Sequence, residues 1–199
     1  VRLTAYKFMK FSFLIILILL ISSCATVETG NKFQPLASIP EDKATIYIYR
    51  PDTYFNWGGW PEIYINSQLQ TSLLNNSHII CHVMPGENRI KAEGSTWGTN
   101  WYPGPVELEY TFSAGVSYYL RITPLQTGST DVQNTLTESA MTNAVLGAAI
   151  QLAVGNLPGW PTAITLMEMV DADTGMIEIQ ETYRLVESNN KRSGEAEPF

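Results

Sequence analysis

The chain has 199 residues, 45% of them hydrophobic and 16% charged, and 19 Asp and Glu outnumber 12 Lys and Arg for a net charge of −7. This length is sufficient for one domain with a substantial core. An acidic chain repels phosphate backbones, so nucleic acid is not an expected partner.

The beginning of the chain has the pattern of an export signal. Between residues 11 and 21 only Ser12 is polar, and Lys10 precedes the run. The run is too short to span a bilayer, which needs about 20 apolar residues, but it fits the core of a secretory signal. It ends at Ile21-Ser22-Ser23-Cys24, where small side chains fit a peptidase cleft and the Cys24 thiol can take a diacylglyceryl group.

This ending resembles the bacterial lipobox, with Ile21 where leucine is commoner. The resemblance implies that residues 1–23 are a signal peptide and that Cys24 becomes the first residue, carrying lipid such as palmitate. The protein would then be a lipoprotein of the bacterial cell envelope, attached to the membrane through Cys24. The alternative is a short membrane anchor that stays uncleaved.

Two neighbouring features refine the signal. Met9 and Lys10 would open a compact lipoprotein signal by themselves, so we interpret residues 1–8 as an upstream extension. Ala25 follows the cysteine, and by resemblance to enterobacterial sorting a residue other than aspartate there favours the outer membrane.

Removal of residues 1–23 would leave 176 residues with 9 Lys and Arg against 19 Asp and Glu, a net charge of −10. The chain has two cysteines, so acylation of Cys24 would preclude an internal disulfide. Residues 24–43 mix Thr, Gly, Asn, Pro and Ser, which predicts a flexible tether with a reach of about 25 Å.

Short segments rich in β-branched and aromatic residues, separated by Gly and Pro turns, predict strands from residue 44 onward. They lie at 45–50, 62–69 (one strand with a turn or bulge at Asn66-Ser67), 77–84, 88–92, 106–112, 117–122 and 165–170. Strands of this length and spacing predict a mainly β domain over residues 44–187, an antiparallel β-sandwich or a half-open barrel.

The pattern changes in an insertion at residues 124–161. Ala140, Ala144, Ala148 and Leu152 recur at four-residue spacing, which predicts a helix within residues 131–156 with a small, close-packing face. After the last strand, we expect a turn at 171–175 and a C-terminal helix at 176–186 with Ile177, Ile179 and Tyr183 facing inward. Residues 188–199 are polar and predict a disordered tail.

Three short motifs carry a family resemblance: Tyr49-Arg50-Pro51 at the end of the first strand, Pro85-Gly86 before a return strand, and Gly115 leading into Tyr118-Tyr119-Leu120. They resemble a bacterial lipoprotein domain of unknown function, of the type numbered twenty-eight forty-six, over about residues 43–186. That domain is similar to PEGA-like β-sandwich modules. The resemblance implies an envelope lipoprotein and supplies no catalytic residues, and the insertion is longer than its pattern needs.

His78, Cys81 and His82 include zinc-ligand types. Strand alternation, however, places Cys81 on one face and both histidines on the other, with the histidines about 13 Å apart. We therefore expect no metal site and a buried, inert Cys81.

Two further patterns fall short of known sites. Asp171, Asp173 and Gly175 resemble the start of a calcium loop, but the later carboxylate ligands are missing, so an ordinary turn is expected. Gly94-Ser95 and Gly115-Val116-Ser117 each lack one glycine of the nucleophile elbow. We expect neither an enzyme nor a cofactor, since both histidines lie on one predicted strand.

The aromatic loops are the strongest candidate binding surface. All five tryptophans fall in Gly- and Pro-rich connections, and the surface comprises Trp57, Trp60, Trp97, Trp101 and Tyr102. Two interpretations stay open: the rings cap the ends of the core, or they are exposed and stack on sugars or sit at a headgroup layer. With an up-and-down strand order, Trp97, Trp101, Trp160 and the alanine-rich helix would face the membrane, while Trp57 and Trp60 would point away.

Two hypotheses for function follow. The first is a lipid-anchored, non-catalytic binding or scaffold module facing the periplasm or the cell surface, with an envelope protein or a glycan as partner. The second is a structural subunit of a membrane-associated complex that contacts its partners through a helix at residues 138–154.

Overall fold

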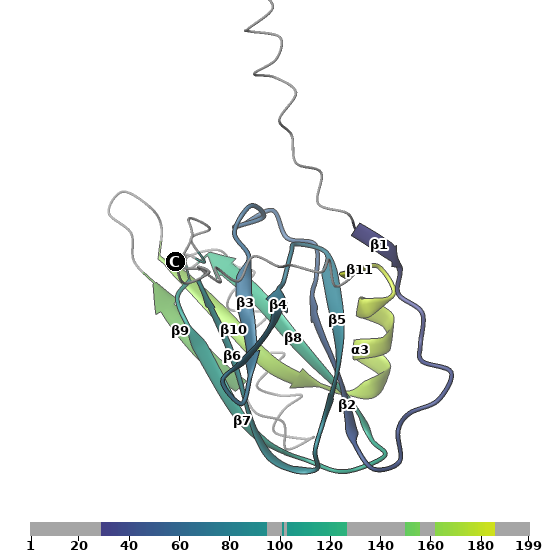
Figure 1. Cartoon of the computed structure of the whole chain (residues 1–199). Helices are drawn as coiled ribbons and strands as arrows, with labels where there is room; N and C mark the ends of the chain where they lie inside the picture. Colours follow the sequence, from purple (N-terminus) through teal and green to yellow (C-terminus); the bar gives the residue numbers. More distant parts are fainter. Residues whose placement is uncertain (1–28, 95–100, 102, 127–149, 156–161, 186–199) are drawn as a thin grey trace, which may run out of the picture.

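Figure 1 shows the computed structural model, which describes residues 29–94, 101, 103–126, 150–155 and 162–185. The larger sheet has the order β1-β11-β5-β2-β8-β10-β9, and the smaller has the order β4-β3-β6-β7. The elements are β1 (Thr29–Lys32), β2 (Ala44–Arg50), β3 (Pro61–Ile65), β4 (Gln68–Ser72), β5 (Ser77–Val83), β6 (Gly86–Gly94), β7 (Val106–Phe112), β8 (Ser117–Gln126), β9 (Ile150–Gly155), β10 (Ala163–Val170), α3 (Ala172–Ile179) and β11 (Tyr183–Leu185).

The two sheets enclose one apolar core. β7 shows how the sequence sets this arrangement, because Val106, Leu108 and Phe112 alternate with polar residues and are buried in the core. This is the period-two pattern of a strand with one wet face. The prediction of a mainly β, sandwich-like fold is confirmed.

β2 is the central strand of the larger sheet and is buried over its whole length. Ile46 and Ile48 face the core between the sheets. Tyr47 and Tyr49 belong to a second cluster on the outer face of the same sheet. Because both faces of β2 are covered, its sequence is almost continuously apolar or aromatic.

α3 covers that outer face (Figure 1) and is held there by a partly buried charge network. Arg121 Nε donates to Glu168 Oε1 at 2.7 Å, and Arg121 also pairs with Glu178 of the helix. Tyr49 Oη donates to Glu178 Oε2 at 2.5 Å. Burial of the Tyr49 hydroxyl and the neighbouring Glu178 carboxylate raise the pKa of this tyrosine. The network thus joins α3 to three neighbouring strands.

The helices differ from the expected ones. Residues 150–155 form β9, paired with β10, so the predicted helix does not extend through them; its earlier part lies outside the described residues. The expected turn at 171–175 is instead the start of α3, with Asp171 as N-cap accepting from the Thr174 amide at 2.9 Å. This hydrogen bond lowers the pKa of Asp171.

Gly175 is in the middle of α3 for a packing reason. A Cβ atom there would lie 2.4 Å from the Tyr119 side chain, so glycine allows the helix to approach the sheet. Ile179 is buried as expected, whereas Ile177 is 69% exposed and the prediction that it faces inward is wrong. The C-terminal helix therefore exists but begins at Ala172 and is followed by β11, an additional strand.

The folded part begins earlier than residue 44. β1 pairs with β11, and the Phe33 amide donates to the carbonyl of Thr182 at 3.2 Å. The Phe33 ring is buried, with its centroid 5.6 Å from that of Tyr47 and 5.2 Å from that of His78. The prediction of a flexible tether through residue 43 is therefore wrong for residues 29–33; residues 24–28 lie outside the described part.

The hairpin of β3 and β4 changes the expected direction of the later strands. Asn66 and Ser67 both have positive φ, 50° and 67°, as a tight two-residue hairpin turn requires, so residues 61–72 form two strands and not one. Each later strand consequently runs opposite to the expected direction. β2 is antiparallel to β5 and parallel to β8, which places the β6–β7 connection at the Arg50 end of β2.

We expect Phe33→Ala to lower the free energy of unfolding by about 3 kcal/mol, because it empties a site against Tyr47 and His78. Urea denaturation of the chain lacking residues 1–24 measures this change. Met84→Ala, at a side chain that is 65% exposed, is the control and should change little. Equal stability of Phe33→Ala and the unmodified chain would mean that residues 29–33 do not belong to the fold.

Candidate functional site

The loop between β2 and β3, residues 51–60, is built around a buried cation. Arg50 ends β2 and has no exposed surface. Its guanidinium donates to the carbonyl of Gly59 at 2.5 Å and to the carbonyl of Asn56 at 2.7 Å. The side chain thus reaches from the last residue of the strand to two carbonyls of the loop and fixes the path of its backbone.

Trp101 completes the environment of Arg50. The guanidinium carbon lies 5.1 Å from the centre of the Trp101 ring, close enough for a cation–π interaction. Burial lowers the pKa of Arg50 to about 10, which leaves the side chain charged at neutral pH, and Asp52 favours this charge. Among the described residues, buried Arg50 Nε and Trp101 Nε1 have no hydrogen-bond partner. The Trp101 ring and the carbonyls of two loop residues therefore stabilise the Arg50 guanidinium.

A second set of hydrogen bonds ties the loop to the segment before β5. Asn75 Oδ1 accepts from the Thr53 amide at 3.1 Å, and Asn75 Nδ2 donates to Asp52 Oδ1 at 2.5 Å. Asn56 has a φ of 55°, a conformation that asparagine tolerates better than most residues. The loop is held at both its beginning and its middle, so its exposed side chains are presented on a fixed backbone.

The structure separates the five residues of the predicted aromatic surface. Trp57 is 67% exposed, Trp60 is partly buried, and Trp101 is 4% exposed under Arg50 and so cannot belong to an exposed surface. Trp97 and Tyr102 lie outside the described residues. Tyr54, which is 95% exposed, was not predicted as part of this surface, although its place next to Phe55 and three residues before Trp57 was a signal.

The expected separation of Trp57 and Trp101 is wrong. Because the β3–β4 hairpin contains two strands, Trp101 packs against Arg50 at the same end of the domain as the 51–60 loop. Trp160 lies outside the described residues. The role of Arg50 was also not predicted, because an arginine at the end of an apolar strand has no periodic signature that distinguishes a buried from a solvated side chain.

The histidines and Cys81 are arranged as the alternation predicted. Cys81 is buried in the core between the sheets, whereas His78 is buried on the outer face. His82 is exposed and its Nδ1 lies 3.1 Å from Thr45 Oγ1. In the described part of the chain no three His, Cys, Asp or Glu side chains are grouped as metal ligands would be.

His78 is held in one neutral form by Thr182. Thr182 Oγ1 donates its proton to the carbonyl of Ile179 at 2.6 Å, so it accepts from His78 Nδ1 at 2.7 Å. Burial, together with the charge of Arg184, lowers the pKa of His78 to about 4. This histidine is therefore a neutral structural group and is not suited to proton transfer near neutral pH.

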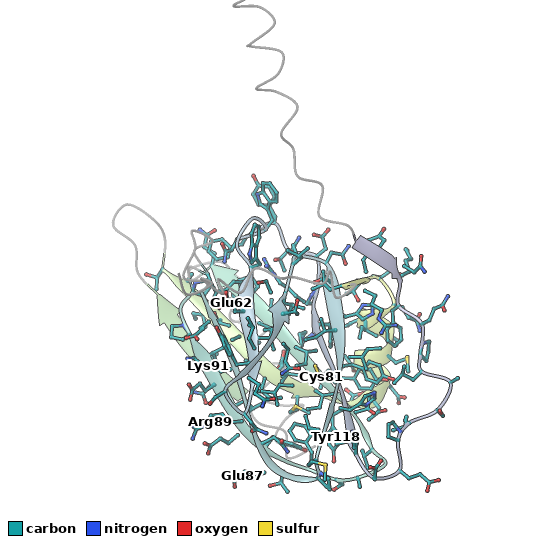
Figure 2. The ribbon with its side chains drawn as sticks, in the orientation of Figure 1. Glu62, Cys81, Glu87, Arg89, Lys91 and Tyr118 are labelled. Atoms are coloured by element: carbon teal, nitrogen blue, oxygen red, sulfur yellow. The ribbon has the colours of Figure 1, made fainter. Side chains whose placement is uncertain are left out.

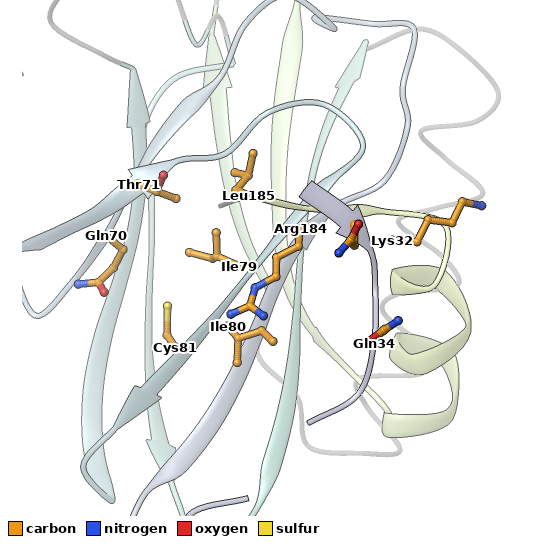
Figure 3. Close-up of a pocket in the computed structure, with 10 residues that line it drawn as sticks. Lys32, Gln34, Gln70, Thr71, Ile79, Ile80, Cys81, Arg184 and Leu185 are labelled. Atoms are coloured by element: carbon orange, nitrogen blue, oxygen red, sulfur yellow. The ribbon is translucent and has the colours of Figure 1, made fainter. Parts of the chain in front are cut away.

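A pocket of about 490 Å³ lies between β1, β4, β5 and β11 (Figure 3). Its wall combines polar side chains, among them Gln70, Thr71 and Arg184, with the apolar side chains of Ile79, Ile80 and Leu185. Such a mixed lining suits a binding groove. The sequence did not predict it, because β1 and β11 were not expected as strands.

Comparison with known proteins finds one matching family model. Residues 40–135 match a family model described as "Protein of unknown function (DUF2846)". No curated protein and no solved structure matches the chain. The match ends before β9, although β10 pairs with β8 along eight residue positions. In the described residues no helix is long and apolar enough to cross a membrane.

We expect Arg50→Met to lower the free energy of unfolding by about 3 kcal/mol, because the carbonyls of Gly59 and Asn56 lose their donors. The loop should also become more sensitive to chymotrypsin at its aromatic residues. Urea denaturation and limited proteolysis measure the two effects. Arg89→Met, at an exposed arginine paired with Glu109, is the control, and equal behaviour of the two variants would contradict the role of Arg50.

His78 should make stability depend on pH. Unfolded histidine has a pKa of about 6.5 and the pKa of folded His78 is about 4, so between these values the unfolded chain binds the extra proton. The stabilisation is complete above pH 6.5 and is lost as the pH falls towards 4, by on the order of 3 kcal/mol. In urea denaturation from pH 7 to 4, His78→Gln should lack this component and His82→Gln should retain it. Parallel profiles for all three chains would refute the assignment.

Proposed function

We propose that this chain, whose residues 40–135 match the DUF2846 family model, is a lipid-anchored binding module of the bacterial envelope. In this proposal Cys24 carries the lipid, residues 1–23 are removed, and the outer membrane holds the protein. The β-sandwich is a non-catalytic binding or scaffold domain.

The anchor is supported by the sequence of residues 10–24. A basic residue, a short apolar run, two small residues and a cysteine follow one another in the order that lipoprotein processing requires. The fold adds a spatial argument, since β1 begins at Thr29, the fifth residue after Cys24. A lipid at that position would hold the folded domain close to the membrane surface.

The observation that carries the binding role is the exposed pair Tyr54 and Trp57 on a loop fixed by buried Arg50. Large exposed rings on a pre-organised backbone lose little conformational entropy when they bind a partner. A glycan, an envelope protein or a lipid surface offers chemistry that such rings recognise.

A non-catalytic role is supported by how the polar groups are used. Arg121, Glu168 and Glu178 bind each other and hold α3 against the sheet. His78 is neutral and engaged with Thr182. These groups stabilise the fold, and the lowered pKa of His78 has a structural cause, its burial.

The alternative of a subunit that binds through a helix at residues 138–154 disagrees with the structure at residues 150–154. Residues 150–154 lie in β9, where they pair with residues 164–168 of β10, so they cannot also form a helical contact face. The remainder of that segment lies outside the described residues.

Cys24→Ala should abolish lipid attachment. In bacteria grown with radioactive palmitate, the unmodified chain should carry label and migrate as a processed form, whereas Cys24→Ala should be unlabelled and should retain its leader. Cys81→Ala is the control, because Cys81 is buried in the core, and this variant should keep the label. Label on a processed Cys24→Ala chain would refute the anchor.

A further inference from the structure

We propose that Tyr54 and Trp57 of the 51–60 loop rest in the headgroup layer of the membrane that anchors the protein. The inference rests on the proposed function, because it requires the lipid on Cys24. It assigns the aromatic loop a lipid surface as its partner and gives the domain one orientation on the membrane.

The register of the larger sheet places β1 and the loop at one end of the domain. Arg50, from which the loop departs, pairs with Ser77, and Ser77 pairs with Tyr183. Tyr183 in turn pairs with Lys32 of β1. One row of the sheet therefore runs from Arg50 to Lys32, and three strand spacings correspond to about 14 Å. Figure 1 shows β1 and the β2–β3 connection at the same, upper end.

The distance available between the anchor and β1 is short. Five residue steps separate Cys24 from Thr29, and a fully extended chain covers about 17 Å over that length. The lipid on Cys24 would thus keep the β1 end within that distance of the membrane. A tether that ran to residue 43 would have left the orientation free, but residues 29–33 are part of the fold.

Two exposed aromatic side chains at this end have the chemistry of the membrane interface. Tyr54 is 95% exposed and Trp57 is 67% exposed. Tyrosine and tryptophan concentrate at headgroup level, since each has an apolar ring and a polar group that stays hydrated. The nearby carboxylate of Asp52 accepts a hydrogen bond from Asn75 and favours a zwitterionic surface over an anionic one.

The opposite end is a less suitable contact surface. It lies about 20 Å from the Arg50 end, the length of the seven residues of β2. Met84 and Val116 are exposed there, but so are the carboxylates of Glu41 and Glu87. Figure 2 shows Glu87 at the lower end, away from the β2–β3 connection. Neither Met84 nor Val116 combines an aromatic ring with a polar group.

The test uses the acylated protein in phosphatidylcholine vesicles whose lipids carry bromine near the head of one acyl chain, where it quenches tryptophan fluorescence. The unmodified chain should be quenched, and Trp57→Phe should lose that quenched component. Met84→Trp is the control, because Met84 is 65% exposed at the opposite end of the domain. The tryptophan added there should not be quenched.

The outcomes separate the orientation from the anchor. Vesicle flotation first reports whether the acylated chain is bound at all. If it does not float, the anchor fails and the orientation fails with it. If it floats but Trp57→Phe is quenched as much as the unmodified chain, or if the tryptophan of Met84→Trp is quenched, the anchor stands and the proposed contact of the loop is overturned.

Discussion

The burial of Arg50 is the constraint on which the presentation of the aromatic loop depends. A guanidinium at the end of the central strand is stabilised by the carbonyls of Gly59 and Asn56 and by the face of Trp101. Desolvation lowers its pKa, and a buried cation with few partners is costly unless those partners keep their places. The loop therefore has little freedom to leave this arrangement. Tyr54 and Trp57 are exposed on this fixed backbone.

The two faces of the larger sheet pack against different partners. Ile46 and Ile48 of β2 contribute to the core between the sheets, while Tyr47 and Tyr49 lie under α3 and Phe33. Residues 29–33 thus cover the same outer face as α3, and β1 lies close to the Arg50 end of the sheet. A lipid on Cys24 would bring that end to the membrane, whereas attachment directly at residue 44 would bring the opposite end.

Strands with strict alternation, such as residues 106–112, could be predicted because burial of one face leaves a local pattern. What could not be predicted depends on distant partners. β1 has the sequence Thr-Gly-Asn-Lys, and its pairing is supplied by β11 more than 150 residues later. Gly175 was interpreted as part of a turn, but its small size serves contact with Tyr119. Counting residues 62–69 as one strand reversed the inferred direction of every later strand, so the expected separation of Trp57 and Trp101 was wrong even though most of the later strands were found.

In the proposed orientation, the 51–60 loop faces the membrane that holds Cys24. Hydrogen–deuterium exchange, followed by mass spectrometry, tests it most directly on the acylated protein in vesicles against the chain without residues 1–24 in solution. The account predicts slower exchange of the amides of residues 51–60 on the membrane and unchanged exchange in the turns at residues 84–87 and 113–116. Protection of those turns with an unchanged loop would contradict it.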